Sequence, residues 1–444
     1  MQRIEIRNLG PIKNIDMDVN DFNLIIGEQA TGKSTIAKAV YYFRYIKTIL
    51  TDYLCQLYDA GTYNDKEVNG GFEKSVRKEL KYTFVSLFGY SWDLDKNLSL
   101  KYYYTADRWI SIKLAGKASK RYISLGFSAE LKNLIHNQEK EALSLHGQKA
   151  SEAGVSLAYA SKERLRNYDN FKKNVNYIFD DDRETYYIPA GRSMITLLVN
   201  NRSLIESNNL DFITRQFMQI IDNIHGSFSK GIKNAHKFYP DGERKFDVSK
   251  VANTLVSDLK GDYQFASGKE YILLSDKNGE NDRIPINFAS SGQQEVLWLL
   301  NQLYILMLKR EKAFVIIEEP EAHLYPSLQN RVVEFISYFM NVNDSSVFIT
   351  THSPYILTSV NALYCGGKLI EEKPQLTEKV RKIVGSNCEI MPQKVTALKL
   401  ARSGAVEDLI DHDMGELGTD MIDEISDGIN SKYTGLYYLD STEG

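Results

Sequence analysis

One short segment near the start of the chain constrains the fold more than any other. Gly27-Glu28-Gln29-Ala30-Thr31-Gly32-Lys33-Ser34-Thr35 contains the pattern G-x-x-x-x-G-K-[ST]. It follows the apolar run 22–26 and precedes a helical segment over 36–50. A glycine-rich turn between a strand and a helix presents backbone N–H groups to phosphate oxygens, and the helix dipole favours the negative charge. The segment therefore predicts a phosphate-binding loop in an α/β domain.

The side chains of this loop predict which phosphate groups are bound. The two glycines allow the backbone to turn inward, and the Lys33 ammonium neutralises the β- and γ-phosphates. The Ser34 hydroxyl is a ligand for Mg²⁺. We therefore expect residues 27–35 to bind a nucleotide, with Ser34 as one of the metal ligands.

A second motif follows another apolar run. Phe314-Val315-Ile316-Ile317 precedes Glu318-Glu319-Pro320, as in a buried strand that ends in carboxylates. Ligands of open α/β sheets lie at the carboxyl ends of the strands. We expect Glu318 to hold Mg²⁺ and Glu319 to position or deprotonate the attacking water. Alone, this tripeptide is more typical of a helix start, and the phosphate-binding loop favours the catalytic interpretation.

Two further segments carry candidate site residues. A strand at 347–350 leads into Thr351-His352-Ser353-Pro354, where His352 could contact the γ-phosphate; the alternative is a helix cap at Ser353 and Pro354. Ser290-Ser291-Gly292-Gln293-Gln294 opens a helix and is a candidate second anion-binding site, with a serine cap as the alternative.

The order of elements predicts the fold class and the domains. Helix 292–307, strand 313–317, helix 327–340, strand 347–350 and helix 354–363 alternate as in a parallel α/β sheet, and the first 26 residues read as strands. We expect a P-loop nucleotide-binding core over 1–50 and 180–365. A mixed, largely helical insertion over 51–179 would split it, with strand-like runs at 98–105 and 109–114 followed by helices to about residue 177. Residues 366–444 form a C-terminal extension.

The extension carries an unusual run of acidic residues. Residues 407–427 contain nine carboxylates and no Lys or Arg, with apolar residues mostly three and four positions apart. This spacing predicts an acidic amphipathic helix over 406–425 that docks either on the body of the protein or on a partner. Gly415 and Gly418 argue against a continuous helix.

The cysteine content and the lack of long apolar runs indicate the cellular compartment. The three cysteines form no CxxC pair, which argues against a disulfide framework or a cysteine zinc site. The first residues lack an apolar signal core, and no run of about 18 apolar residues follows. We therefore expect a cytoplasmic protein that does not interact with membranes.

Taken together, these motifs resemble those of ABC-type ATPases of the SMC/RecF branch, particularly the OLD-like ATPases of bacterial phage-defence systems. By this resemblance residues 27–34 are the Walker A motif, Ser291-Gly292-Gln293 the ABC signature, Glu318 the Walker B acid and Glu319 the catalytic glutamate. Residues 322–325 are the D-loop and His352 is the switch histidine. The segments 319–324 and Tyr187-Ile188-Pro189-Ala190-Gly191-Arg192 are also typical of the group. Position 318 is Glu where ABC proteins usually have Asp.

The resemblance implies a function. It implies an ATP- and Mg²⁺-dependent homodimer, or a higher oligomer of dimers, that acts as a sensor or scaffold for a separately encoded effector nuclease, as in Septu- or PARIS-like defence. The alternative is a RecF-like DNA-maintenance ATPase whose insertion clamps duplex DNA through basic residues. The candidates are Lys117, Lys120, Arg121, Arg164, Arg166, Lys172 and Lys173. A self-contained nuclease is disfavoured because about 80 residues after the last expected helix are too few for a Toprim domain.

Overall fold

A computed structural model describes residues 2–64, 66–67, 71–89, 97–117, 120–149, 157–200, 210–240, 242–275, 281–411, 414–418, 430–434 and 436. Its central sheet has the strand order β16(Val406–Asp408), β15(Val395–Leu400), β3(Phe22–Gly27), β14(Ser346–Thr351), β13(Ala313–Glu318), β9(Glu184–Ile188). All neighbouring pairs are parallel except β15 and β16. This confirms the predicted fold class, an α/β P-loop domain.

A second, antiparallel sheet has the order β2(Ile12–Val19), β1(Gln2–Leu9), β6(Ser99–Tyr103), β7(Trp109–Lys117), β8(Lys120–Phe127). Strand β8 corrects the expectation of helix after residue 114. Ile123, Leu125 and Phe127 are buried and alternate with less buried residues, which is the two-residue period of a strand with one face in the core. The strands of the expected insertion thus share a sheet with the first residues of the chain, and the proposed domain boundaries do not separate two folding units at residue 50.

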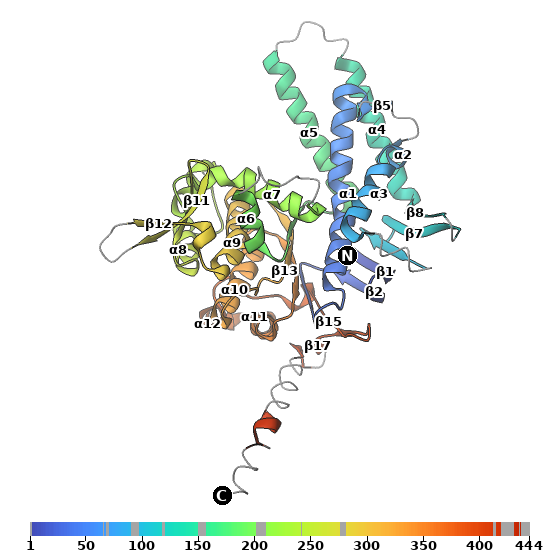
Figure 1. Ribbon diagram of the computed structural model, residues 1–444. Helices are drawn as coiled ribbons and strands as arrows, with labels where there is room; N and C mark the ends of the chain where they lie inside the picture. The colour runs from blue at the N-terminus through green and yellow to red at the C-terminus, as the bar shows by residue number, and fades with distance from the viewer. Residues whose placement is uncertain are drawn as a thin grey trace, which may run out of the picture.

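The helices cover both faces of the central sheet (Figure 1). One face packs against α1(Lys33–Ala60) and the second sheet; the other packs against α9(Ser291–Lys309), α10(Pro326–Val342) and α11(Pro354–Glu372). Successive residues of β13 show this division, because Phe314 and Ile316 join the first core and Val315 and Ile317 the second. Burial on both faces explains why these strands are continuous apolar runs.

The remaining elements surround this framework. Helices α4(Ala129–Lys149) and α5(Leu157–Phe179) pack against α1 and extend with it beyond the sheets (Figure 1). Strands β10(Asp262–Ala266), β11(Lys269–Ser275) and β12(Asn281–Pro285) form a small antiparallel meander. The other elements are α2(Gly71–Ser75), α3(Arg77–Phe88), α6(Arg192–Asn200), α7(Phe212–His225), α8(Val248–Asp258), α12(Thr377–Val384) and the short strand pairs β4(Thr62–Tyr63)–β5(Lys66–Glu67) and β17(Ile410–Asp411)–β18(Glu416–Leu417). Within the described residues, no helix is both long and apolar enough to cross a lipid bilayer.

The expected acidic helix over 406–425 is wrong where the chain is described. Residues 406–408 pair with β15 at the edge of the central sheet, and 410–411 and 416–417 pair with each other. The edge of β15 offers backbone hydrogen bonds, and these outweigh the helical preference of the three- and four-residue apolar spacing. Gly415 has a φ of +63°, a left-handed conformation that would interrupt a helix. Residues 419–425 lie outside the described part. The C-terminal extension contributes to the core through β15, which pairs with β3 in the central sheet.

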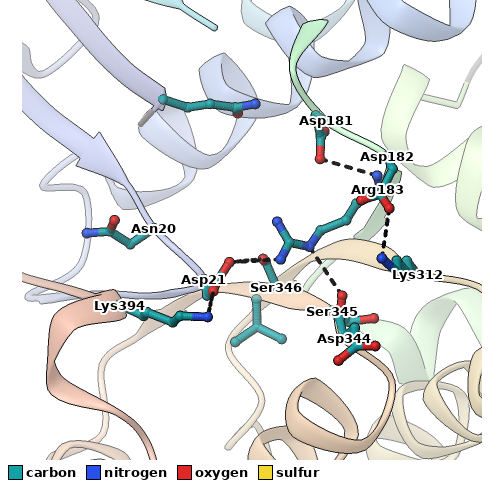
Figure 2. A network of polar contacts seen from close by, with 12 residues as sticks. Asn20, Asp21, Asp181, Asp182, Arg183, Lys312, Asp344, Ser345, Ser346 and Lys394 are labelled. Carbon is teal, nitrogen blue, oxygen red and sulfur yellow. Dashed lines mark hydrogen bonds and ion pairs between the residues drawn. The ribbon is translucent and has the colours of Figure 1, made fainter. Parts of the chain in front are cut away.

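The amino ends of the central strands are joined by a polar network (Figure 2). The Asp21 carboxylate, just before β3, binds Arg183 at 3.0 Å and Lys394 at 3.0 Å and accepts a hydrogen bond from Ser346 at 2.9 Å. Arg183 precedes β9 and Lys394 precedes β15. These contacts fix the strands at the end of the sheet opposite to the candidate site.

Candidate nucleotide-binding site

The phosphate-binding loop has the shape that its glycines predict. Gly32 caps α1 with a φ of +104°, and a Cβ atom there would lie 2.4 Å from Ile12 Cδ1. A Cβ atom on Gly27 would lie 2.4 Å from the carbonyl oxygen of Leu400, because β15 pairs with β3 up to that residue. The Thr31 hydroxyl donates to the carbonyl of Glu28 at 2.9 Å and closes the turn. Both glycines are therefore required by the packing as well as by the loop.

Lys33 lies inside this loop. Its Nζ donates to the carbonyl oxygens of Gly27 at 2.8 Å and Glu28 at 2.7 Å and lies 3.1 Å from Nδ1 of His352. Burial lowers the pKa of Lys33 to about 8, although the carboxylates of Glu319, Glu321 and Glu318 favour its charged form. The three ammonium protons thus have three acceptors, and a phosphate must replace some of them.

His352 connects Lys33 to the predicted catalytic carboxylate. Because an ammonium only donates, Nδ1 of His352 accepts, and Nε2 carries the proton toward Glu319 Oε1 at 3.1 Å. Glu321 holds the histidine backbone, since its Oε1 accepts from the His352 amide at 2.8 Å and from the Thr351 hydroxyl at 2.7 Å. The structure therefore brings together Lys33, Glu319 and His352, as the motifs predict.

Glu318 lies at the end of β13, beside the same loop. Its carboxylate is buried, Oε2 lies 3.4 Å from the Ala190 amide, and within the described residues Oε1 has no hydrogen-bond partner. A buried carboxylate oxygen without a donor fits a divalent cation, with the hydroxyl of Ser34, at the start of α1, as a second oxygen ligand. Within the described part of the chain, no group of three or more His, Cys, Asp or Glu side chains is arranged to hold a metal ion.

The candidate second anion site begins α9. Ser290 is the helix cap: its hydroxyl accepts from the Gln293 amide, and the Gln293 side chain accepts from the Ser290 amide at 3.0 Å and donates to the Leu259 carbonyl at 2.8 Å. The serine-cap alternative is thus present, and the side chain of Gln293 is engaged within its own chain. Ser291 is exposed, and the amides of Ser291 and Gly292 lie in the first turn, where a helix supplies no acceptor. Nucleotide contact by these residues stays a prediction.

Three charged residues that support the site were given no role from the sequence. Glu321 holds His352, and Arg192 and Glu295 form a buried ion pair at 3.5 Å behind Glu318 and Glu319. The sequence motif that ends in Arg192 is typical of the resembled ATPases, but by itself it assigns Arg192 no role. The sequence gives one indication of a role for Arg192, which is its position just after an apolar strand. A cation buried there needs several hydrogen-bond acceptors around it.

The basic residues named for the DNA alternative are partly neutralised. Lys172 lies 2.8 Å from Glu184, and Arg164 binds the Asp59 carboxylate. These two residues are therefore weaker candidates for phosphate contacts than free surface cations.

Comparison with known proteins gives the class. The model of the AAA ATPase domain family (AAA_15) matches residues 1–357, so the chain belongs to that family. It is therefore a protein with an ATPase domain of the AAA type. Among curated relatives, protein ea59 of Escherichia phage lambda is 27% identical over 117 residues, which are 26% of this chain and 22% of that protein. The uncharacterised protein MJ1542 of Methanocaldococcus jannaschii is 31% identical over 108 residues, 22% of this chain and 13% of that protein. The chain thus matches less than a quarter of either relative.

Two solved structures are similar over most of the chain at low scores. An SMC head bound to the C-winged helix domain of ScpA gives a TM-score of 0.34 at 13% identity, over 80% of this chain and 90% of that one. The SMC head domain of Thermotoga maritima gives 0.33 at 10% identity, with the same coverage.

Proposed function

We propose that the protein binds and hydrolyses ATP at sites shared between two copies of the chain. The observation that carries this proposal is the chain of contacts Lys33–His352–Glu319 beside the phosphate-binding loop. In each site, Lys33 and residues 27–35 of one chain would bind the phosphates, Ser34 and Glu318 would hold Mg²⁺, and Ser291 and Gly292 of the other chain would close over the γ-phosphate.

The exposed aromatic residues around α9 support a second copy as the partner. Phe288 lies three residues before Ser291 and is 76% exposed, and Tyr325, in the D-loop segment, is 78% exposed. Large aromatic side chains are enriched in protein interfaces, so two exposed rings near the start of α9 suit contact with a second copy. Both side chains would become buried if a second copy covered the start of α9.

In this proposal each catalytic step has a candidate group. Bound Mg²⁺ would neutralise phosphate charge and orient the γ-phosphate. Glu319 would orient the attacking water and accept its proton, and His352 would donate from Nε2 to Glu319 or to the phosphate. The test is Mg²⁺-dependent ATP turnover by the purified chain: Lys33→Ala should lose nucleotide binding, and turnover that persists in this variant would place the activity elsewhere.

We further propose that this ATPase is the cytoplasmic sensor or scaffold of a bacterial antiphage system and controls a separately encoded nuclease. The support is the set of motifs shared with OLD-like ATPases, which are residues 27–34, 187–192, 319–324 and 351–354. The test is phage plating on a bacterium that carries this gene with its neighbour. Protection should disappear with Lys33→Ala. A DNA-maintenance role would instead give no protection and a DNA-damage phenotype.

A further inference from the structure

Arg192 is a fully buried cation directly behind the predicted catalytic glutamates. Its Nε donates to the Glu295 carbonyl at 2.7 Å, and its Nη1 donates to the carbonyls of Pro189 at 2.9 Å and Glu318 at 2.7 Å. Its Nη2 donates to the Glu319 carbonyl at 2.9 Å. Four carbonyl oxygens from three separate segments therefore meet at one planar guanidinium, whose donors have a fixed geometry.

Glu295 joins the same group from α9. Its Oε2 accepts from the Arg192 amide at 3.0 Å, and its Oε1 accepts from the amide of Ser193 at 3.0 Å and from the Ser193 hydroxyl at 2.7 Å. The carboxylate thus caps the start of α6 and compensates the buried guanidinium. The Glu295 side chain thus makes four contacts: three with the first residues of α6 and one with the guanidinium of Arg192.

The backbone at Glu319 depends on this support. Its φ is +43°, a left-handed conformation that costs a non-glycine residue on the order of 1 kcal/mol or more. The Glu319 amide donates to the Thr350 carbonyl at 2.8 Å, and the carbonyl on its other side is held by Arg192. Such a conformation persists only where neighbouring groups fix it, so the direction of the Glu319 carboxylate depends on both contacts.

The start of α9 lies against the same turn. A Cβ atom on Gly292 would lie 2.9 Å from the carbonyl oxygen of His323, in the turn that follows Glu319. Ser291 and Gly292 are one turn before Glu295 on a rigid helix. A shift of α9 would therefore be transmitted through Glu295 and Arg192 to the backbone of Glu318 and Glu319.

We propose that Arg192, held by Glu295, is a positioning residue that couples the start of α9 to the catalytic carboxylate of Glu319. The proposal rests on the proposed ATPase function. In the proposed dimer, Ser291 of one chain contacts the nucleotide bound by the other chain, whereas Glu319 acts on the nucleotide bound by its own chain. The proposal predicts that these two residues are coupled within one chain. Closure of one shared site would therefore change the orientation of Glu319 in the other site.

The first test is Arg192→Lys in the full chain. Lysine keeps the charge but cannot reach the four carbonyl oxygens from one nitrogen. ATP turnover per bound nucleotide should fall by about tenfold to a hundredfold, because small misplacements of catalytic groups have effects of this size, while the stoichiometry and affinity of a non-hydrolysable ATP analogue should remain unchanged. Turnover is counted per bound nucleotide, so that unfolded chains, which bind none, do not lower the value. A decrease then reports misplacement of Glu319 and not loss of folded protein.

The matched control is Arg44→Lys. Arg44 is also buried; it donates to Thr185 at 3.2 Å and Gln2 at 2.7 Å and binds Asp181, near the amino end of the sheet. Its substitution should lower the thermal midpoint and leave turnover per bound nucleotide unchanged. Equal turnover per bound nucleotide in Arg192→Lys and Arg44→Lys would overturn the proposal.

A second variant covers the case in which Arg192→Lys does not fold. Glu295→Asp keeps the charge and withdraws the carboxylate by one methylene, and it should lower turnover in the same way. In the double variant Glu295→Asp, Ser291→Ala, the fold-loss of turnover should differ from the product of the two single fold-losses, since both substitutions act through α9. A fold-loss equal to that product would refute the coupling. If the wild-type chain hydrolyses no ATP, the proposed function fails instead, which distinguishes the two outcomes.

Discussion

Replacing Lys33 by Met should stabilise the nucleotide-free protein while abolishing nucleotide binding. Burial lowers the pKa of Lys33 from 10.5 to about 8, so below pH 8 the charged form is disfavoured in the folded state by on the order of 3 kcal/mol. Methionine removes this penalty but leaves the carbonyls of Gly27 and Glu28 without their donor, at a cost of about 1 kcal/mol each. The expected net gain at pH 7 is about 1 kcal/mol.

The sign of the pH dependence follows from the same shift. The folded-state pKa lies below the unfolded value, so between pH 8 and 10.5 the unfolded chain holds a proton on Lys33 that the folded chain has lost. The stability of the wild type should therefore rise through this window, by about 1.4 kcal/mol per pH unit, relative to Lys33→Met. The advantage of the variant at pH 7, about 1 kcal/mol, should therefore reverse at about pH 8.7.

The assay is urea unfolding of both proteins at pH 7, 8, 9 and 9.5 without nucleotide. Lys38→Met is the control, because Lys38 is a half-buried lysine on the next turn of α1. If Lys33→Met is less stable than the wild type at pH 7, or if the difference between them does not change with pH, the account of a desolvated Lys33 is wrong.

Three further predictions concern the site and the C-terminal strands. Glu319→Gln should keep ATP and Mg²⁺ bound but reduce turnover by orders of magnitude; unchanged turnover would move the catalytic role away from Glu319. Gly32→Ala should weaken nucleotide binding and destabilise the chain by about 1–3 kcal/mol, since its Cβ would collide with Ile12 at a φ of +104°; adding Ile12→Ala should recover part of the loss, as thermal unfolding would show. Truncation after residue 418 should preserve ATP turnover, whereas truncation after 405 removes β16 and the buried Leu409 and Leu417 and should lower the thermal midpoint; equal midpoints would show that these strands do not stabilise the core.

The sequence predicts that the candidate site residues lie close together, because they follow buried strands. Glu318 and His352 each follow a continuous apolar run, which is typical of a parallel strand with both faces buried by helices. The carboxyl ends of such strands lie at the same edge of the sheet. The phosphate-binding loop follows the third of these strands. Local pattern and tertiary position therefore agree for Lys33, Glu319 and His352.

The same reasoning failed where tertiary contacts decide the structure. Residues 406–408 have helical spacing but lie beside β15, whose edge supplies backbone partners. The order of strands that places β6–β8 next to β1 depends on pairing across about a hundred residues, which no local pattern reveals. Arg192 and Glu295 are about a hundred residues apart, and only the fold shows that they compensate each other.

The central claim, an ATP site shared by two chains, is tested most directly with mixed dimers. Lys33→Ala chains and Ser291→Arg chains carry different tags, are co-expressed, and are purified through both tags in turn. Each mixed dimer contains one site with an intact Lys33 from one chain and an intact Ser291 from the other, although both pure variants are inactive. The account predicts that mixed dimers recover turnover well above that of either pure variant, up to about half of the wild-type value if the two sites act independently. Mixed dimers as inactive as the separate variants would contradict it.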